Sequence, residues 1–246
     1  MKAKRWYIFL SLALVISSIT TYLVQNAIFH KSEDTLFYMM QDLAFVPVQV
    51  LLVMLIIDRL LQRKEKEALL HKMNMVVGVY FNEMGRDLIS HFIKVSGSAD
   101  ALRAQMLVAG DWDDNRFATV KESSKHMKYD LQLDDGSLEE LKGFLGAKRE
   151  LVLRLLENPN LLEHESFTDL LWAVCHLSDE LMHRTSLSNL PKPDIDHLKG
   201  DIIRAFRLLN KEWLEYMQHL KKSYPYLYSL AVRINPFNTD SSAVIY

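Results

Sequence analysis

WYIFLSLALVISSITTYLV, residues 6–24, is the first of two apolar segments near the N-terminus; LAFVPVQVLLVMLIIDRLL, residues 43–61, is the second. The first has no charged side chain over 19 residues. At about 1.5 Å per residue, a helix of that length crosses the ~30 Å core of a bilayer. The second is uncharged for 15 residues before Asp58 and Arg59, which is marginal for a span. Leu60 and Leu61 extend it if Arg59 reaches the headgroups, and residues 37–40 could extend it at the other end. We predict a two-helix transmembrane hairpin, with an interfacial or re-entrant second helix as the alternative.

Basic residues near these segments predict the orientation of the hairpin. The connector, about residues 25–42, has Lys31 as its only lysine or arginine. The other basic residues precede the first segment or follow the second: Lys2, Lys4, Arg5, Arg59, Arg63, Lys64, Lys66 and Lys72. By the positive-inside rule both termini face the cytoplasm, which predicts a multi-pass protein of the inner (cytoplasmic) membrane. A cleaved signal peptide is disfavoured, because the apolar run is too long and no small-x-small site follows it.

Small side chains recur every four residues on the first segment, at Ala13, Ser17 and Thr21. Such a stripe lets transmembrane helices approach closely. Packing within the hairpin is the simpler interpretation, and self-association of two chains is the alternative.

Composition limits the function classes. The chain has 29 basic and 31 acidic side chains, so it lacks the broad positive field of a nucleic-acid-binding protein. Its single cysteine, Cys175, cannot form an internal disulfide, in agreement with a reducing cytoplasm. The connector is too short to bury a core, so a folded extracellular sensor is excluded. Only 8 glycines and 6 prolines occur in 246 residues, which favours long helices.

Capping residues and breakers predict the helices after the hairpin. The second apolar helix should continue to about residue 95, followed by a short helix over 99–109 and a weakly helical, irregular surface segment over 111–130. Ser137 and Glu140 have the spacing of a capping box, which predicts a helix to about residue 157. Further helices are expected over 167–185 (capped by Ser166), 194–223 and 225–233.

The longest of these helices carries an apolar stripe at helical spacing: Ile195, Leu198, Ile202, Phe206, Leu209, Trp213, Tyr216 and Leu220. This stripe predicts the central helix of a bundle. The predicted fold is therefore all-α, with a transmembrane hairpin over 1–61 and a cytoplasmic helical bundle over 62–246.

His176, Glu180 and His183 are the first candidates for a metal site. Glu180-Leu-Met-His183 matches the Glu-x-x-His element of di-metal sites in helical bundles, and His176 lies one turn earlier. On a helical projection, however, both histidines point away from the apolar stripe centred on Val174, which favours a solvated face. Trp172 lies on that same outward face, and this keeps the metal site as an alternative.

Two further polar groups recur at helical spacing: Glu83, Asp87 and His91, and then Glu212, Glu215 and His219. Buried acids need partners, so structural pairing is the simpler interpretation of the first group. A salt-bridged helix edge is the simpler interpretation of the second. Glu83, Glu212 and His219 are the remaining candidate metal ligands.

The pattern of a di-metal carboxylate bundle is incomplete, because such a site needs two Glu-x-x-His elements and two more glutamates. Asp194-Ile-Asp-His197 is a poor second element at a helix start. The sequence has no phosphate loop, Gly-rich dinucleotide turn, HExxH motif or serine nucleophile elbow. Cys175 and His176 are neighbours in sequence, but they point about 100° apart on a helix and form no dyad. No catalytic residue and no cofactor are predicted.

Three stretches of this sequence are similar to those of a known protein family: VYFNEMGRDLI (79–89), FTDLLWAVCHLSDEL (167–181) and HLKGDIIRAFRLLNKEWLEYMQHLKKSYPYLYSLAVRINPFN (197–238). They resemble an uncharacterised family of prokaryotic membrane proteins. The resemblance implies the same plan, a two-span hairpin followed by a helical cytoplasmic domain. It implies no activity, cofactor or partner.

Two functions follow as hypotheses. The first is a membrane-anchored helical module that binds a protein partner or self-associates, as a scaffold or in signalling. The second is a metal-dependent membrane-bound enzyme that uses some of the six candidate ligands. The two hypotheses differ in whether the candidate side chains meet at one point in the fold. A metal site requires this, because its ligand atoms must all lie about 2.0–2.2 Å from one ion.

Overall fold

The computed structural model describes residues 2–29, 32–159, 161 and 164–244, without the side chains of 2–11, 26, 29, 32–33, 35 and 66–71. The described part is all-helical, and it contains no strand beyond an isolated bridge between Ser96 and Leu131. The chain divides into two compact units, Met1–Lys66 and Glu67–Tyr246. The predicted start of the first span at Trp6, and the basic residues at positions 2, 4, 5, 31 and 66, lie outside the described side chains.

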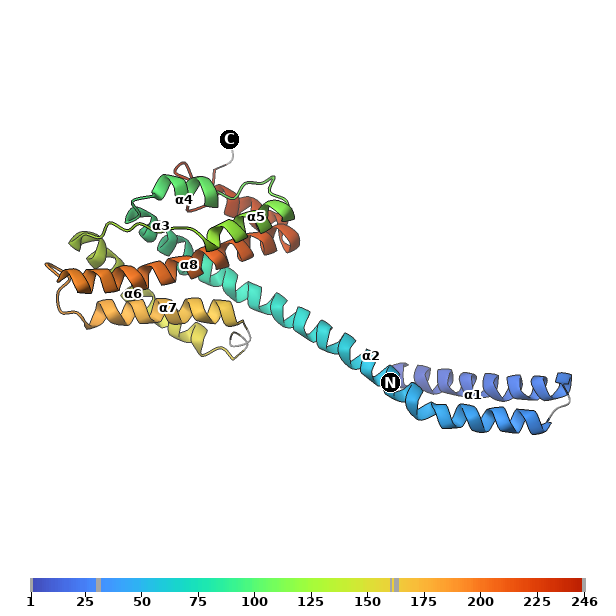
Figure 1. The fold of residues 1–246 in the computed structure, drawn as a ribbon. Coiled ribbons are helices and arrows are strands. Elements are labelled where there is room, and N and C mark those ends of the chain that lie inside the picture. Colours follow the sequence, from blue (N-terminus) through green and yellow to red (C-terminus); the bar gives the residue numbers. More distant parts are fainter. Residues whose placement is uncertain (1, 30–31, 160, 162–163, 245–246) are drawn as a thin grey trace. The chain divides into compact units, whose positions relative to one another are not determined.

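The first unit contains helix α1 and the first part of helix α2 (Figure 1). Helix α1 covers Lys2–Phe29, and α2 covers Ser32–Tyr80. Tyr22 on α1 donates a hydrogen bond to Asp42 Oδ2 on α2, at 3.4 Å. Both helices extend into the connector predicted over about residues 25–42. That segment contains neither glycine nor proline to stop them.

One described helical segment is long and apolar enough to cross a membrane. It is Leu36–Glu65, with 30 residues; its most apolar 18-residue window has a mean hydropathy of 2.1, and none of that window is buried. Leu12–Gln25 is apolar but shorter. The described residues therefore contain one candidate span where the sequence predicts two.

The second unit is a helical bundle around helix α8 (Figure 1). After α2, a π-helical turn, η1, leads into α3. The elements are η1 (Phe81–Gly85), α3 (Arg86–Lys94), α4 (Ala99–Met106), α5 (Asp114–Lys125), α6 (Asp135–Leu156), α7 (Glu165–His183), α8 (Lys192–Ser223) and α9 (Pro225–Arg233). Helix α8 packs against α3, α5, α7 and α9, and α7 also packs against α6.

The predicted apolar stripe of the longest helix forms the centre of the core. Ile195 is half-buried, and the other seven members of the stripe are buried. The apolar face of α7 is buried as well: Phe167, Leu170, Leu171, Val174, Leu177 and Leu181. Burial of each large apolar side chain contributes about 1.5–3 kcal/mol. These two faces fix α7 against α8 and so determine which polar side chains meet at the edge of their contact.

The turn η1 interrupts the predicted continuous helix from the second apolar segment to residue 95. Phe81 stacks on Tyr216 with ring centroids 5.0 Å apart. A Cβ atom on Gly85 would lie 2.6 Å from Phe81 Cδ1 and 2.9 Å from Tyr80 Cε1. The close packing of these two rings around the turn explains why a glycine occupies position 85.

Three local predictions differ from the structure because of capping. The expected irregular segment contains α5, whose N-cap Asp113 accepts a hydrogen bond from the Arg116 amide. The capping box of α6 pairs Asp134 with Ser137, so that helix begins at Asp135. Helix α7 is capped by His164, whose ring nitrogen accepts from the Phe167 amide, and Ser166 lies inside the helix. Several side chains can cap each of these ends, and tertiary packing selects among them.

Candidate metal centre

Two pairs of potential metal ligands face each other across the contact between α7 and α8. Helix α7 contributes His176 and Glu180, and α8 contributes His197 and Asp201. Each pair has i, i+4 spacing, which places both side chains on one face of its helix. Because His176 lies beside Asp201 and Glu180 lies beside His197, the two helices are antiparallel at this point.

The ligand atoms of these four residues converge. One nitrogen or oxygen from each lies within 4.8 Å of one from every other. Asp201 Oδ2 is 3.4 Å from Nε2 of both His176 and His197. Glu180 Oε1 is 3.8 Å from His176 Nε2, and Glu180 Oε2 is 3.6 Å from His197 Nε2. We refer to His176, Glu180, His197 and Asp201 as the α7–α8 cluster.

Asp201 is the buried member of the cluster. Its side chain is 3 % exposed, against 47 % for His176 and 52 % for His197. Arg204 Nη1 donates a hydrogen bond to its Oδ1 at 2.9 Å. The other oxygen, Oδ2, is buried and accepts no hydrogen bond within the described part of the chain. A buried carboxylate oxygen without a donor is costly unless a cation compensates it, and this oxygen points at two imidazole nitrogens.

Arg184 holds the outer side of the cluster in place. Its guanidinium donates to Glu180 Oε2 at 2.8 Å and makes two hydrogen bonds to the Asp194 carboxylate, at 2.6 and 3.0 Å. These hydrogen bonds lower the pKa of Glu180 and the pKa of Asp194, and they raise the pKa of Arg184. Glu180 is therefore kept ionised and restricted in orientation by its hydrogen bond to Arg184.

The spacing in the α7–α8 cluster fits a single transition-metal ion. Zinc takes four ligands at tetrahedral corners with bonds of about 2.0–2.2 Å, which places neighbouring ligand atoms about 3.3–3.5 Å apart. Four of the separations, 3.4, 3.4, 3.6 and 3.8 Å, are close to this value; the last two end on different Glu180 oxygens, and the ligand atoms of all four residues lie within 4.8 Å of one another. Small rotations of the partly exposed His176, His197 and Glu180 side chains would close the difference.

The other predicted ligands on α7 and η1 lie outside the cluster. His183 is exposed, and its Nδ1 lies 2.8 Å from the backbone oxygen of Asp179. Glu83 is in η1 and pairs with Lys148 at 3.9 Å. The structure therefore unites two of the six sequence-predicted candidates, His176 and Glu180, with two residues that were not among them.

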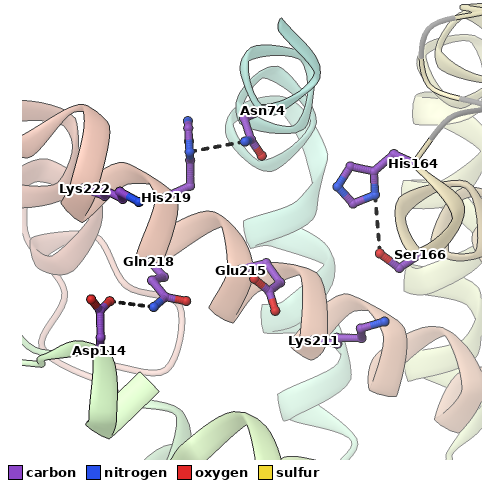
Figure 2. A pocket seen from close by; sticks show the side chains of 9 residues that line it. All are labelled: Asn74, Asp114, His164, Ser166, Lys211, Glu215, Gln218, His219 and Lys222. Carbon is purple, nitrogen blue, oxygen red and sulfur yellow. Dashed lines mark hydrogen bonds between the residues drawn. The ribbon is translucent and has the colours of Figure 1, made fainter. Parts of the chain in front are cut away.

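Glu212 and His219 lie farther along α8, beside a polar pocket of about 600 Å³ (Figure 2). Its lining consists of Asn74, Asp114, His164, Ser166, Lys211, Glu215, Gln218, His219 and Lys222. Asn74 Nδ2 is 3.2 Å from His219 Nδ1. Gln218 donates to Asp114 at 2.7 Å, and Lys121 pairs with Glu215 at 2.6 Å. We refer to this set as the α8 pocket; its acidic groups each have a separate partner.

Glu212 is buried beneath this stretch of α8, with a relative exposure of 1 %. Burial raises its pKa, while a hydrogen bond from Ser166 opposes the shift. Burial raises the pKa of Tyr80 too, and the Glu212 carboxylate contributes to that shift. The Glu212 carboxyl therefore holds its proton more tightly than an exposed glutamate does, and it belongs to no group of three or more potential metal ligands among the described residues.

The sequence contained a signal for the two missed ligands. His197 and Asp201 repeat the i, i+4 spacing of His176 and Glu180, with an aspartate in place of the glutamate. Asp201 also directly precedes Ile202 in the apolar stripe, where an acidic side chain is unexpected. Only the antiparallel packing of α7 on α8 shows that the two pairs meet.

Two family models match almost the whole chain. One describes the C-terminal helical domain of the uncharacterized protein MJ1433 and matches residues 69–233; the other describes its N-terminal helical domain and matches residues 2–61. The chain belongs to the MJ1433 family. The uncharacterized protein MJ1433 of Methanocaldococcus jannaschii is 45% identical over 241 residues, which cover 98% of this chain and 97% of that protein. No solved structure matches. The predicted resemblance to an uncharacterised all-helical family is confirmed, and the names of the MJ1433 models state neither an activity nor a membrane location.

Proposed function

We propose that this MJ1433-family protein is an integral membrane protein whose helical domain binds one divalent transition-metal ion through the α7–α8 cluster. The observation that carries the proposal is the convergence of two imidazoles and two carboxylates around Asp201 Oδ2, a buried oxygen without a hydrogen-bond donor. A metal ion would compensate that oxygen and hold the two helices together.

The ligand set indicates the class of metal. Two nitrogen and two oxygen ligands suit zinc, iron(II) or manganese, whereas magnesium and calcium take oxygen ligands. Zinc, which takes four nitrogen or oxygen ligands in one site, is the member of this group that we test. His176, His197 and Glu180 are partly exposed, which provides a path for the ion to enter.

The membrane part of the proposal rests on the apolar segments and on charge. Leu36–Glu65 has the length and hydropathy of a span. We propose that residues 6–24 and 43–61 both cross the bilayer and that both termini are cytoplasmic, because the basic residues flank the hairpin. The domain boundaries that follow are 1–61 for the hairpin and 62–246 for the cytoplasmic domain.

A second function, self-association or binding of a protein partner, is supported by the small-residue stripe on α1. Ala13, Ser17 and Thr21 are exposed, and Thr21 Oγ1 donates to the Ser17 backbone oxygen at 2.9 Å. The Thr21 hydroxyl therefore needs no partner on another helix, and the small side chains of the stripe allow a second helix to pack closely against α1. Such pairing would give the protein a scaffold role in the membrane.

Elemental analysis of the full-length protein in detergent tests the metal site. The protein is purified without a histidine tag, loaded with zinc and freed of excess ion. We expect about one zinc per chain, and we expect His197→Gln to weaken zinc binding at least about tenfold. His183→Gln is the matched control, since His183 is an exposed histidine at the C-terminal end of α7 and lies outside the cluster.

Two results would contradict the metal proposal. The first is a folded wild-type protein that retains no zinc after removal of excess ion. The second is equal zinc affinity in wild type and His197→Gln. A carbonate-wash fractionation that released the full-length protein from membranes would contradict the membrane part independently.

A further inference from the structure

We propose that a hollow beside the α7–α8 cluster is a binding subsite for a planar ligand that carries a phosphate, such as a nucleoside monophosphate. This inference rests on the proposed metal site, because the phosphate would be held between the ion and Arg204. The hollow has a volume of about 380 Å³ and is lined by Asp169, Trp172, Ala173, His176, Arg204 and Leu208.

The hollow lies along the same contact between α7 and α8 as the cluster. On α7, Trp172 lies one turn before His176, and on α8, Arg204 lies one turn after Asp201. His176 belongs to both the hollow and the cluster, and Arg204 lines the hollow while it bonds Asp201. A ligand in the hollow is therefore adjacent to the metal ligands.

Trp172 provides a flat apolar wall. It is 60% exposed, although the face of α7 that carries Val174 is buried in the core. Its neighbour Ala173 is 7% exposed and also lines the hollow. An indole at the edge of a concave polar site stacks well on a planar heterocycle, and such stacking tolerates many ring types.

Arg204 provides the anion-binding group. Its side chain is 60% exposed, and the described residues engage it in one ion pair, from Nη1 to Asp201 Oδ1 at 2.9 Å. A guanidinium has five N–H donors in a fork that matches phosphate oxygens, so donors remain for a ligand. Asp169 is an acceptor in the same lining, suited to an amine or hydroxyl of the ligand. The combination of a ring wall, a cation and an acceptor matches a nucleotide better than a simple anion.

The test uses adenosine monophosphate as the probe, with equilibrium dialysis against zinc-loaded full-length protein in detergent. We expect binding at micromolar to millimolar concentration, with adenosine and inorganic phosphate each at least about tenfold weaker than adenosine monophosphate. Trp172→Ala and Arg204→Gln should each weaken binding of adenosine monophosphate at least about tenfold. Tyr226→Ala and Arg154→Gln are matched controls, an exposed aromatic residue and an exposed arginine outside the hollow.

The zinc content of each sample separates the two proposals. A chain that holds no zinc contradicts the metal site, whatever its affinity for the nucleotide. If zinc-loaded wild type binds no adenosine monophosphate, or if wild type and Trp172→Ala bind it with equal affinity, the subsite proposal is overturned and the metal proposal is not. Trp172 makes no hydrogen bond to the cluster, so its variant keeps the test valid even if Arg204→Gln loses zinc.

Discussion

The α7–α8 cluster and the α8 pocket draw on the same types of side chain, yet they arrange them differently. In the pocket, Gln218 bonds Asp114 and Lys121 pairs with Glu215, so each carboxylate has its own partner. In the cluster, Asp201 Oδ2 faces two imidazoles and accepts no hydrogen bond from the described residues. Acids and histidines at helical spacing therefore indicate a metal site only when their polar atoms converge and at least one buried acceptor lacks a hydrogen-bond donor within the protein.

The largest expected effect comes from Asp201, the buried centre of the cluster. Asp201→Asn keeps the shape of the side chain but removes its charge, so we expect zinc affinity to fall about a hundredfold. The measurement is a competition titration against a chelating dye with full-length protein.

Glu215→Gln in the α8 pocket is the control for this comparison, and its zinc affinity should equal that of the wild type. Equal losses in the two variants would show that general charge, rather than convergence, governs metal binding. The thermal midpoint of metal-free Asp201→Asn should stay near the wild-type value, which excludes misfolding as the cause of a loss.

A smaller effect is expected from Arg184, which touches Glu180 but does not belong to the cluster. Arg184→Gln frees the Glu180 carboxylate and leaves Asp194 without its two hydrogen bonds. We expect zinc affinity to fall about tenfold, as is usual when a residue that only orients a metal ligand is replaced, while the stoichiometry stays at one ion per chain. A variant with unchanged affinity would mean that Glu180 is not a ligand and that three residues hold the ion.

Zinc should also stabilise the fold, since it binds the native cluster and the separated ligands of an unfolded chain much less well. At free zinc a hundredfold above Kd the gain is about 2.7 kcal/mol, which raises the thermal midpoint by roughly 5–10 °C for a domain of this size. Scanning calorimetry of wild type and His197→Gln, each with and without zinc, measures it. Equal increases in both proteins would refute specific binding at the cluster.

The smallest effect concerns Glu212, beside the α8 pocket. Burial raises its pKa above the ordinary 4.5, so the folded state binds this proton more tightly than the unfolded state does. The stability from this group is complete below pH 4.5 and is lost as the pH rises through the folded pKa. Glu212→Gln should therefore flatten the decline of the thermal midpoint that the wild type shows as the pH rises above 4.5, measured with chelator present. A steeper decline in the variant would reverse the assigned direction of the pKa shift.

The apolar patterns of α7 and α8 made most of the fold predictable. The stripe that contains Phe206 and Trp213 is buried as expected, because helical periodicity depends only on local spacing. The helix α5 was missed, since its stability depends on the Asp113 cap and on packing against α8. The α7–α8 cluster was half predicted for a related reason. His176 and Glu180 share one helix, whereas their contact with His197 and Asp201 depends on how α7 packs on α8.

The π-helical turn Phe81–Gly85 has a consequence for how this chain tolerates insertions and deletions. An α-helix advances about 100° per residue, so one residue too few in this turn rotates everything after it by that angle. The apolar face of α3, with Leu88, Ile89 and Phe92, would then turn partly toward water. The turn acts as a phase correction between two helical segments. Removing a single residue there would convert the turn to regular α-helix, but it would rotate the apolar side chains of α3 away from the core.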